Sequence, residues 1–575
     1  MARKTVAAQL VDVLAEAGVR RIYGVAGDSL NGITDSIRKS KQLEWAHMRH
    51  EEVAAFAAGA EAHLTGGLAV CAGSCGPGNL HLINGLYECH RSRVPVLAIA
   101  AQIPSVEIGS GYFQETHPEQ LFAQCSHYCE LVSHPDQMPR VLEIAIQTAI
   151  SRRGVSVVVI PGDVALQETE GRAPRSSFPK PETRVCPSED ELNQLAAVLN
   201  AAERPTILGG AGCAGAHDEL TALAGKLKAP IVHALRGKEF IEYDNPFDVG
   251  MTGLLGFSSG YHAMMNCDVL LMLGTDFPYQ QFFPTHAKVI QIDVRGEQLG
   301  RRARLDYGYV GDVKTTIGAL LPKLRQNGSD EHLQKSSDHY RKTRRHLDDL
   351  ATESEPDKPI HPQYVARVVD ELAAEDAIFS CDVGSPTVWA ARYLKMNGRR
   401  RLLGSFTHGS MANAMPQAIG AQASHPGRQV ISLSGDGGLA MLLGDLLTIR
   451  QMKLPIKIVV FRNESLAFVE LEMKSAGIVD FATNLDNPSF AKIAEVVGFL
   501  GLTAKTPDQV RPMIAQAFAY DGPALVEVMV SRQELSMPPT ITAEQAKGFS
   551  LFMLRAVLSG RGDEIIDLAK VNLFR

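Results

Sequence analysis

The sequence predicts an α/β protein built from three doubly wound parallel-sheet domains followed by a C-terminal amphipathic helical tail. Short apolar runs rich in β-branched residues, among them "VPVLAIA", "VSVVVIPGD", "DVLLMLG" and "PIKIVVF", alternate along the chain with amphipathic helix patterns. Continuous apolar strands separated by helices indicate parallel sheets covered on both faces. Polar stretches over 167–190 and 325–363 interrupt this alternation and are typical of linkers.

The domain boundaries follow from the chain length and from these two polar stretches. A chain of 575 residues is too long for a single hydrophobic core. We therefore predict one domain over 1–182, a second over 183–335, a third over 336–530 and the tail over 531–575.

The composition excludes some classes of function. With 45% hydrophobic and 21% charged residues the chain has the make-up of a soluble enzyme, and its net charge of −7 gives no sign of nucleic-acid binding. The nine cysteines lack zinc-finger spacing and favour a reducing compartment. Charged residues interrupt the apolar pattern of residues 1–25, so we expect no signal peptide, and no apolar run reaches the length of about 18 residues that a membrane span needs. We expect a cytoplasmic protein.

A carboxylate and an amide follow two successive strands of the third domain. The stretch "SLSGDGG" (432–438) places Asp436 in a glycine turn at the end of a strand, and the next strand, "PIKIVVF", is followed closely by Asn463. In an open parallel sheet, ligands bind at this edge. Carboxylate, amide and backbone oxygens suit Mg²⁺ that holds a diphosphate. Alternatively, the glycines only form a tight turn and Asn463 only caps a strand.

This arrangement resembles the fingerprint of enzymes that use thiamine diphosphate. The resemblance implies that Asp436, Asn463 and the backbone of Ser465 bind Mg²⁺. The sequence departs from the family pattern at Arg462, where the family has a first asparagine, and at Glu464, where it has a small residue. The cofactor-binding residues that the resemblance implies in this domain are Gly409, Ser410, Met411, Asp436, Gly437, Gly438, Asn463, Glu464, Ser465, Leu466 and Ala467.

Glu51 stands at the start of an alanine-rich helix pattern, "HMRHEEVAAFAAGAEA" (47–62). In the family that the chain resembles, a glutamate at this place hydrogen-bonds N1′ of the cofactor's aminopyrimidine, which implies a catalytic role for Glu51. Such a carboxyl group must be shielded from water, and desolvation is expected to raise its pKa. Alternatively, the helix dipole favours any glutamate at a helix N-terminus, and Glu52 would serve equally well.

Three further motifs follow in the same order as in the family. "AGSCGPGNL" (72–80) resembles the glycine turn on the pyrimidine side, and "GYFQETH" (111–117) resembles the motif that places Phe113 and Gln114 beside the reacting carbon. In "THGSMANAMP" (407–416), the resemblance implies that the Gly409 carbonyl accepts the 4′-amino hydrogen and that Met411 supports the bent cofactor. Methionine is unbranched and polarisable, although it also commonly fills cores.

The central domain has a glycine motif and candidate flavin contacts. "TILGGAGCAG" (206–215) contains a GxGxxG pattern after a strand, which alone is weak evidence for a dinucleotide site. Neighbouring segments resemble the FAD-binding segments of flavin-containing family members. They imply contacts to FAD from Thr252, Gly253, Leu254, Leu255, Thr275, Asp276, Phe277, Pro278, Tyr279, Asp293 and Asp312. Each of these aspartates also suits a simple helix cap.

Across nearly the whole chain the resemblance is to the pyruvate oxidase family, in its quinone-reducing branch. It implies oxidative decarboxylation of pyruvate to acetate and CO₂, with thiamine diphosphate, Mg²⁺ and FAD as cofactors and ubiquinone as electron acceptor. It also implies a homotetramer in which a neighbouring subunit donates the glutamate. Within "ESLAFVELE" (464–472) it implies roles over the substrate for Phe468, Val469 and Glu472, although an amphipathic helix with buried Phe and Val explains those two residues equally well.

The tail carries one apolar stripe at helical spacing, made by Phe549, Phe552, Met553, Ala556 and Val557. Such a helix commonly packs on its own domain. The resemblance implies instead a tail that covers the site at rest and, once released, binds the phospholipid surface on the inner face of the cell membrane.

Two other hypotheses stay open. One is a carboligase or plain decarboxylase of the same superfamily, similar to acetolactate synthase, in which FAD is structural or absent. The other is a catalytically silent scaffold at a lipid surface, motivated by Arg462 and by the tail; the retained Glu51, Asp436 and Asn463 argue against it.

Overall fold

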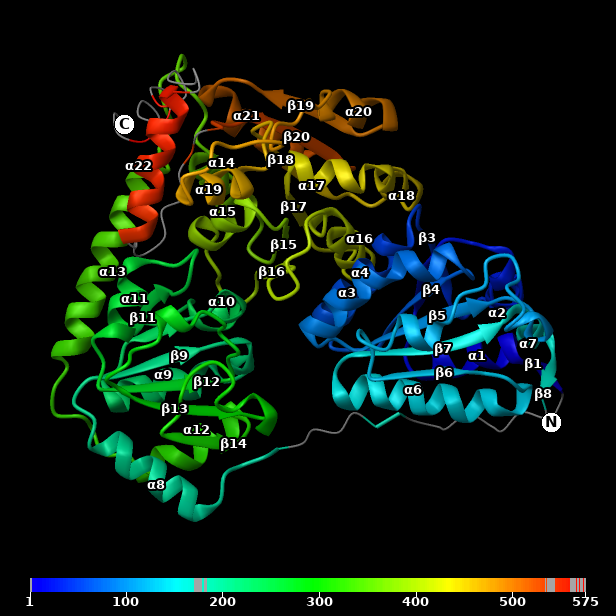
Figure 1. The fold of residues 1–575 in the computed structure, drawn as a ribbon, viewed down its shortest axis with the longest axis horizontal. Helices are drawn as coiled ribbons and strands as arrows, with labels where there is room; N and C mark the ends of the chain where they lie inside the picture. The colour runs from blue at the N-terminus through cyan, green and yellow to red at the C-terminus, as the bar shows by residue number, and fades with distance from the viewer. Residues whose placement is uncertain are drawn as a thin grey trace.

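Three α/β domains make up the computed structural model, in which the structure describes residues 3–169, 178–179, 184–532, 534 and 543–558, with residues 565, 568 and 572. Figure 1 shows the N-terminal domain in blue and cyan, the central domain in green and the C-terminal domain in yellow and orange. Each domain contains a six-stranded sheet whose neighbouring strands are parallel. The predicted fold class is therefore confirmed. Parts of the predicted linker 167–190 and of the tail lie outside the described residues.

The N-terminal sheet has the strand order β3-β2-β4-β5-β7-β6. Its strands are β2 Arg21–Gly24, β3 Glu44–His47, β4 Ala69–Gly73, β5 Val96–Gln102, β6 Tyr128–Leu131 and β7 Val155–Pro161. Its helices are α1 Val6–Glu16, α2 Asn31–Ser40, α3 Glu51–Thr65, α4 Pro77–Ser92, α5 Pro118–Leu121, α6 Met138–Arg152 and α7 Gly162–Leu166. Short strands β1 Lys4–Thr5 and β8 Glu168–Thr169 pair separately and are antiparallel.

The central sheet has the order β11-β10-β9-β12-β13-β14. Its strands are β9 Pro205–Gly209, β10 Ile231–His233, β11 Asp248–Met251, β12 Val269–Leu273, β13 Lys288–Asp293 and β14 Tyr307–Val310. Its helices are α8 Glu189–Asn200, α9 His217–Leu227, α10 Lys238–Ile241, α11 Ser258–Met265, α12 Val313–Leu320 and α13 Glu331–Leu350. Helix α13 packs against α11 and β11 and continues without a break past the boundary predicted at residue 335. Leu347 near its end lies in the hydrophobic core of the C-terminal domain, so this helix packs on both domains.

The C-terminal sheet has the order β16-β15-β17-β18-β20-β19. Its strands are β15 Ile378–Cys381, β16 Arg401–Gly404, β17 Val430–Gly435, β18 Lys457–Arg462, β19 Leu500–Ala504 and β20 Ala524–Met529. Its helices are α14 Pro362–Leu372, α15 Ser385–Tyr393, α16 Ala414–Ser424, α17 Asp436–Met441, α18 Leu446–Gln451, α19 Ala467–Ser475, α20 Phe490–Val497, α21 Pro507–Ala519 and, in the tail, α22 Ala543–Leu558.

Helix α3 joins the N-terminal and C-terminal domains, because it packs against both α4 and α16. Every residue from Val53 to Ala62 is buried, as expected for a helix enclosed on all faces. The small side chains let the two helix backbones approach closely: a Cβ built on Gly420 would lie 2.0 Å from the Ala57 carbonyl oxygen. The alanine-rich sequence is therefore explained by helix packing, which also fixes the start of α3.

Helix α22 packs against α19 of the C-terminal domain (Figure 1, red against orange). Phe552 and Ala556 of the predicted stripe are buried, and the Phe552 ring centroid lies 5.2 Å from the Lys474 ammonium. Val557, which was also predicted to lie on the stripe, is 58% exposed. A Cβ on Gly548 would come within 1.9 Å of the Ser475 carbonyl oxygen, so the contact needs glycine. Among the described residues, no helix has both the length and the apolar character needed to cross a membrane.

Asp248 at the start of β11 lies in a buried polar group between the central sheet and α13. Its Oδ1 accepts the Gly250 N–H at 3.2 Å and lies 3.6 Å from His233 Nε2. Burial, and after it the nearby Glu242 carboxylate, raises the pKa of Asp248 to about 8, and the Tyr340 hydroxyl of α13 opposes that shift. Near pH 7 this carboxyl group is therefore protonated in the folded chain.

The Asp248→Asn variant is expected to flatten the dependence of stability on pH. An unfolded aspartate ionises near pH 4, so between about pH 4 and pH 8 the folded state binds a proton that the unfolded state lacks. Stability conferred by the wild-type residue therefore falls as pH rises through this window, by about 5 kcal/mol. Thermal midpoints of the wild-type protein and the variant at pH 5, 6.5 and 8 test this. The same change of midpoint with pH in both proteins would contradict it.

Candidate active site

The metal-loop candidates lie at the carboxyl edge of the C-terminal sheet. Strands β17 and β18 are neighbours, and their register pairs Gly435 with Phe461. Asp436 follows β17 directly and Asn463 follows β18, so the parallel register brings both residues to the same edge, as the sequence predicted.

Asp436 is 2% exposed, and its carboxylate is held by backbone groups. Oδ2 accepts the Glu464 N–H at 2.8 Å, and Oδ1 accepts the Gly437 N–H at 3.0 Å. Burial raises the pKa of Asp436, while these two N–H groups oppose the shift. A buried carboxylate with its remaining lone pairs free suits a hard cation better than an isolated charge.

The loop after β18 is fixed by a second segment of the chain. The Leu466 N–H donates to the Thr483 carbonyl at 2.9 Å, and the Leu485 N–H donates to the Glu464 carbonyl at 2.9 Å. The Thr483 hydroxyl is buried and has no hydrogen-bond partner among the described residues. The Asn463 Oδ1 accepts the Ser465 N–H at 3.2 Å. Hard oxygen donors beside an unpartnered buried hydroxyl fit Mg²⁺ with a bound diphosphate.

The segment around Met411 packs onto the same turn. The Met411 methyl lies 3.6 Å from a Cβ built on Gly437, and a Cβ on Gly438 would come within 2.4 Å of an Asp382 carboxylate oxygen. The contact with Asp382 therefore requires glycine at position 438, whereas the Met411 methyl is at an ordinary van der Waals distance from position 437. Gly409 has a positive φ of 83°, and Ser410 Oγ donates to the Met411 carbonyl at 2.9 Å.

Asp382 is a site residue that the sequence analysis did not identify. It follows β15 and is 1% exposed; its Oδ1 accepts the Ala414 N–H at 2.9 Å and its Oδ2 accepts the Gly435 N–H at 3.3 Å. Burial raises its pKa to about 7. One carboxyl group thus joins the glycine turn to the start of α16. The sequence signal that could have identified Asp382 is its position directly after β15, a strand of the same sheet as β17 and β18.

Glu51 and Glu52, which the sequence did not distinguish, have different surroundings. Glu51 is 7% exposed, lies 3.0 Å from His81 Nδ1 through Oε2, and faces Gly78 of the "SCGPGN" turn. Glu52 instead accepts a 2.8 Å bond from Asn84 Nδ2, which also contacts Ser410 Oγ at 2.9 Å. Glu51 therefore faces the predicted pyrimidine turn, and Glu52 contributes to the contact between two domains of one chain.

His50, Glu51 and His81 place one donor atom each within 4.8 Å of one another, a spacing that a metal ion could use. The His50 Nδ1, however, accepts the Glu52 N–H at 3.2 Å and caps α3. In a neutral imidazole this puts the ring proton on Nε2, which leaves no lone pair there for a metal. The cluster is therefore better explained as a support for Glu51 than as a metal centre.

Gln114 lies beside the same glycine turn. The Cys75 thiol donates to Gln114 Oε1 at 3.3 Å, and a Cβ on Gly76 would meet the Gln114 Cβ at 2.9 Å. Gln114 has a positive φ of 63°, which non-glycine residues adopt rarely and mostly at functional turns. Phe113, which was predicted to lie with Gln114 beside the reacting carbon, is 78% exposed. Glu51, this turn and Gln114 thus form one half of a site.

The two halves are separate within one chain. Among the described residues, no hydrogen bond or ion pair joins Glu51 or Gln114 to the loop that follows Asp436. Helix α3 contacts the C-terminal domain through α16, away from that loop. In the single chain, the residues around Glu51 and the loop after Asp436 therefore form two groups without a direct hydrogen bond or ion pair among the described residues.

Helix α19 carries the residues predicted to lie over the substrate. Phe468 is half-buried against the core of the C-terminal domain, whereas Val469 is 46% exposed and Glu472 is exposed. The buried residues of this helix are Glu470 and Lys474, and Glu470 accepts bonds from Ser465 Oγ and from Lys474 Nζ. The sequence analysis did not identify Glu470, although it fixes α19 to the predicted metal loop.

The central sheet presents a glycine cradle at its carboxyl edge. A Cβ on Gly212 would lie 2.6 Å from Gly274 Cα, and Gly253 has a positive φ of 97°. The Thr252 hydroxyl is buried and has no partner among the described residues. Phe277 and Tyr279 stack edge to face with ring centroids 5.4 Å apart. A tight backbone cradle with an unpartnered hydroxyl fits a dinucleotide.

The aspartates predicted to contact FAD differ in their surroundings. Asp312 caps α12 by accepting the Thr315 N–H at 2.8 Å, and Asp276 is paired with Arg302 at 2.9 Å. Asp293 is 3% exposed and accepts the Arg295 N–H at 3.0 Å. The helix-cap explanation thus accounts for Asp312, while Asp293 keeps a strand-end position. Leu254 is 42% exposed, and the Leu255 carbonyl accepts a 3.0 Å bond from Arg392.

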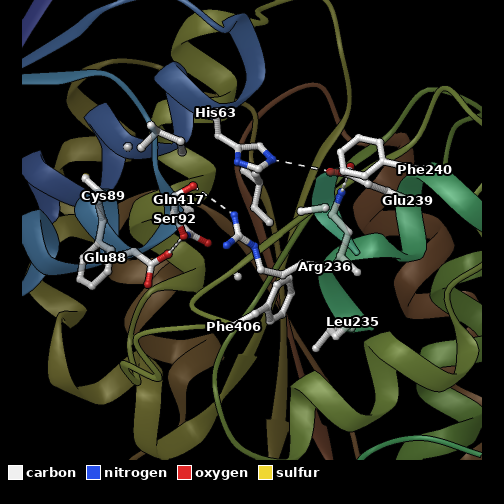
Figure 2. Close-up of a pocket in the computed structure, with 18 residues that line it drawn as sticks. His63, Glu88, Cys89, Ser92, Leu235, Arg236, Glu239, Phe240, Phe406 and Gln417 are labelled. Atoms are coloured by element: carbon white, nitrogen blue, oxygen red, sulfur yellow. Dashed lines mark hydrogen bonds and ion pairs between the residues drawn. The ribbon is translucent and has the colours of Figure 1, made fainter. Parts of the chain in front are cut away.

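A small pocket of about 40 Å³ lies where the three domains meet (Figure 2). Its walls include Ala211 beside the glycine cradle, Phe406 of the C-terminal domain and His63 of α3. Arg236 projects into it and donates to the Ser92 carbonyl at 3.0 Å, and burial lowers its pKa. Residues of all three domains therefore line this pocket.

Comparison with known proteins agrees with this geometry. Models of three domains of thiamine pyrophosphate enzymes match this chain. The N-terminal TPP binding domain matches residues 4–122, the central domain matches residues 192–320, and the C-terminal TPP binding domain matches residues 382–528. Thiamine pyrophosphate is another name for thiamine diphosphate.

Several curated relatives cover most of the chain. A putative thiamine pyrophosphate-containing protein of Bacillus subtilis, YdaP, is 36% identical over 99% of both chains. The pyruvate oxidase of Lactiplantibacillus plantarum is 32% identical over 91% of this chain and 88% of its own. An acetolactate synthase of Mycobacterium bovis is 31% identical over 92% of this chain and 88% of its own. With three matching domain models and relatives of this similarity along its length, the chain belongs to the thiamine pyrophosphate enzyme family.

Proposed function

We propose that the protein is a thiamine- and flavin-dependent pyruvate oxidase that converts pyruvate to acetate and CO₂ and passes the electrons through FAD to ubiquinone. The observation that carries this proposal is the glycine cradle of the central domain, with its unpartnered Thr252 hydroxyl, in the same chain as a thiamine-type metal loop. A binding cradle for a second cofactor is what an oxidase needs and a plain decarboxylase lacks. The similarity to a pyruvate oxidase supports the choice of substrate.

In this proposal the chain's own residues bind and orient the cofactors and move one proton. Asp436, Asn463 and the Ser465 carbonyl would hold Mg²⁺, and Met411 would support thiamine diphosphate from the packed side of the turn. Thiamine diphosphate, when bound, supplies the carbon nucleophile and the electron sink. Glu51, shielded and beside His81, exchanges a proton with the aminopyrimidine. Phe113, Gln114, Val469 and Glu472 would enclose pyruvate.

The proposal includes a homo-oligomer, which we infer to be a tetramer. Phe113 and Val469 are large apolar side chains that are 78% and 46% exposed in the single chain. Isolated apolar residues are common on surfaces, but these two flank the two half-sites. Pairing of two copies would cover them and complete both sites.

The main alternative is a carboligase, and the observation that favours it is the similarity to an acetolactate synthase over 92% of this chain. A silent scaffold is the second alternative. It is disfavoured because the guanidinium of Arg462, which motivated it, bonds Glu527 and Glu464 and leaves the candidate metal ligands intact.

An anaerobic spectrum tests the proposal. The protein is purified with thiamine diphosphate and Mg²⁺, its visible spectrum is recorded, and pyruvate is added without oxygen. Bleaching of a bound flavin together with CO₂ release is the expected result. Release of CO₂ while the flavin stays oxidised, with acetolactate as product, would support the carboligase. A protein with neither flavin nor CO₂ release would support the scaffold.

Glu51→Gln is expected to lower the rate of flavin reduction by about 10²- to 10⁴-fold, because glutamine cannot exchange the proton. Glu52→Gln is the matched control: its amide oxygen can still accept the Asn84 bond, so its rate should stay within a few-fold of wild type. Stopped-flow reduction with pyruvate measures both, and calorimetry with thiamine diphosphate checks that both bind it. Equal losses in the two variants would contradict the assignment.

We also propose that α22 leaves α19 and binds a phospholipid surface on the inner face of the cell membrane. Gly548→Leu should displace the helix, since a Cβ there already meets Ser475, whereas Lys547→Leu adds the same side chain at an exposed position. Gly548→Leu is therefore expected to raise quinone reduction several-fold in the absence of lipid and to speed proteolysis of the tail. A displaced, protease-sensitive tail with unchanged activity would contradict this role.

A further inference from the structure

Arg462 replaces the first asparagine of the family pattern, and its guanidinium is fully engaged by the protein. Nη2 donates to Glu464 Oε1 and to the Asn487 carbonyl, both at 2.7 Å. Nη1 donates to Glu527 Oε1 at 2.7 Å and to the Pro488 carbonyl at 3.3 Å, and Nε donates to Glu464 Oε1 at 3.1 Å. A guanidinium has five N–H groups, so none is left for a bound diphosphate. Its function must therefore lie in what it holds together.

One end of this cluster is a rigid anchor. Glu527 on β20 is fully buried and also accepts bonds from Ser489 Oγ at 2.8 Å and from the Phe490 N–H at 3.2 Å, at the N-terminus of α20. A buried carboxylate with this many donors is well satisfied. Arg462 is thus fixed to the centre of the domain through Glu527.

The other end is the loop that contacts Asp436. Glu464 has a positive φ of 56°, a conformation that costs a non-glycine residue about 1 kcal/mol or more and needs support from its surroundings. In this conformation its N–H donates to Asp436 Oδ2 at 2.8 Å. The Asn487 amide lies 3.4 Å from the same oxygen. Arg462 bonds the side chain of Glu464 and the backbone carbonyl of Asn487.

We propose that Arg462 and Glu464 form a clamp around Asn463 that holds the loop in its metal-binding conformation, taking over the part that asparagine and a small residue have in the family pattern. Both are positioning residues. They act on the metal and the diphosphate through the backbone of Glu464 and through Asn487. The two departures from the family pattern are thereby explained as one compensated pair, because Glu464 provides the carboxylate that Arg462 needs on the loop side.

Binding of Mg²⁺ and thiamine diphosphate to the cofactor-free protein tests the clamp. Arg462→Asn leaves the Glu464 carboxylate without its partner and should weaken Mg²⁺-dependent binding by about 10- to 100-fold, the range typical of residues that orient metal ligands. The double variant Arg462→Asn with Glu464→Ser restores the family pattern and should bind within a few-fold of wild type. Calorimetry at several Mg²⁺ concentrations gives these affinities.

Two controls keep the test decisive. Arg367→Asn breaks an exposed ion pair with Glu371 in the same domain and should leave binding unchanged. Glu464→Gln keeps the bond between Arg462 and Glu527 and should weaken cofactor binding by about 3- to 10-fold. This variant tests the clamp if Arg462→Asn does not fold. Wild-type affinity in Arg462→Asn, or a double variant no better than that single variant, would overturn the proposal. The readout is cofactor binding, so it is independent of whether flavin chemistry occurs.

Discussion

The bond from the Glu464 N–H to the Asp436 carboxylate is the interaction on which the site depends, because it joins the ends of two neighbouring strands. The parallel register of β17 and β18 brings both residues to one edge of the sheet. The bond then fixes where the carboxylate points. Everything else at this edge supports that orientation: Asp382 holds the turn through Gly435, and Arg462 holds the loop through Glu464. The positions of the candidate metal ligands thus follow from the topology, and their orientation follows from buried polar contacts.

The fold could be predicted because the inner strands of each sheet are short apolar runs, which is the signal that burial of both sheet faces leaves, although edge strands such as β3 and β6 are less buried. The boundary near residue 335 could not be predicted, because α13 is polar over most of its surface. Only His332, Ser336 and Leu347 of this helix are buried, so its sequence looks like a linker. Its packing depends instead on contacts with α11 and on the Asp248 and Tyr340 pair, which join segments that are distant in sequence.

At the site, the residues that sequence analysis identified are those with a local signal. Asp436 and Glu51 stand at an element boundary beside glycine or a helix start, and the structure gives them the surroundings that these positions suggest. Asp382 was missed because its partners are backbone N–H groups of other segments, and Glu470 was missed although its partners Lys474 and Ser465 are near it in the sequence. Asp312 has a local role that was also expected, because its carboxylate caps α12, and its contact to FAD stays a prediction. Arg462 was correctly noticed as a departure, yet its meaning required Glu527, which is far along the chain.

The tail and the metal loop are connected through a single short helix. The Phe552 ring of α22 lies against the Lys474 ammonium, Lys474 donates to Glu470, and Glu470 accepts a bond from Ser465. Arg532, just after the last strand, also bonds Glu470 at 3.1 Å. Glu470 and Lys474 are both buried, and ion pairs in such surroundings are strongly orientation-dependent. Any displacement of α22 therefore exposes a buried cation and changes the environment of the carboxylate that holds Ser465. The position of the tail and the shape of the metal loop therefore both depend on contacts made by the same helix, α19.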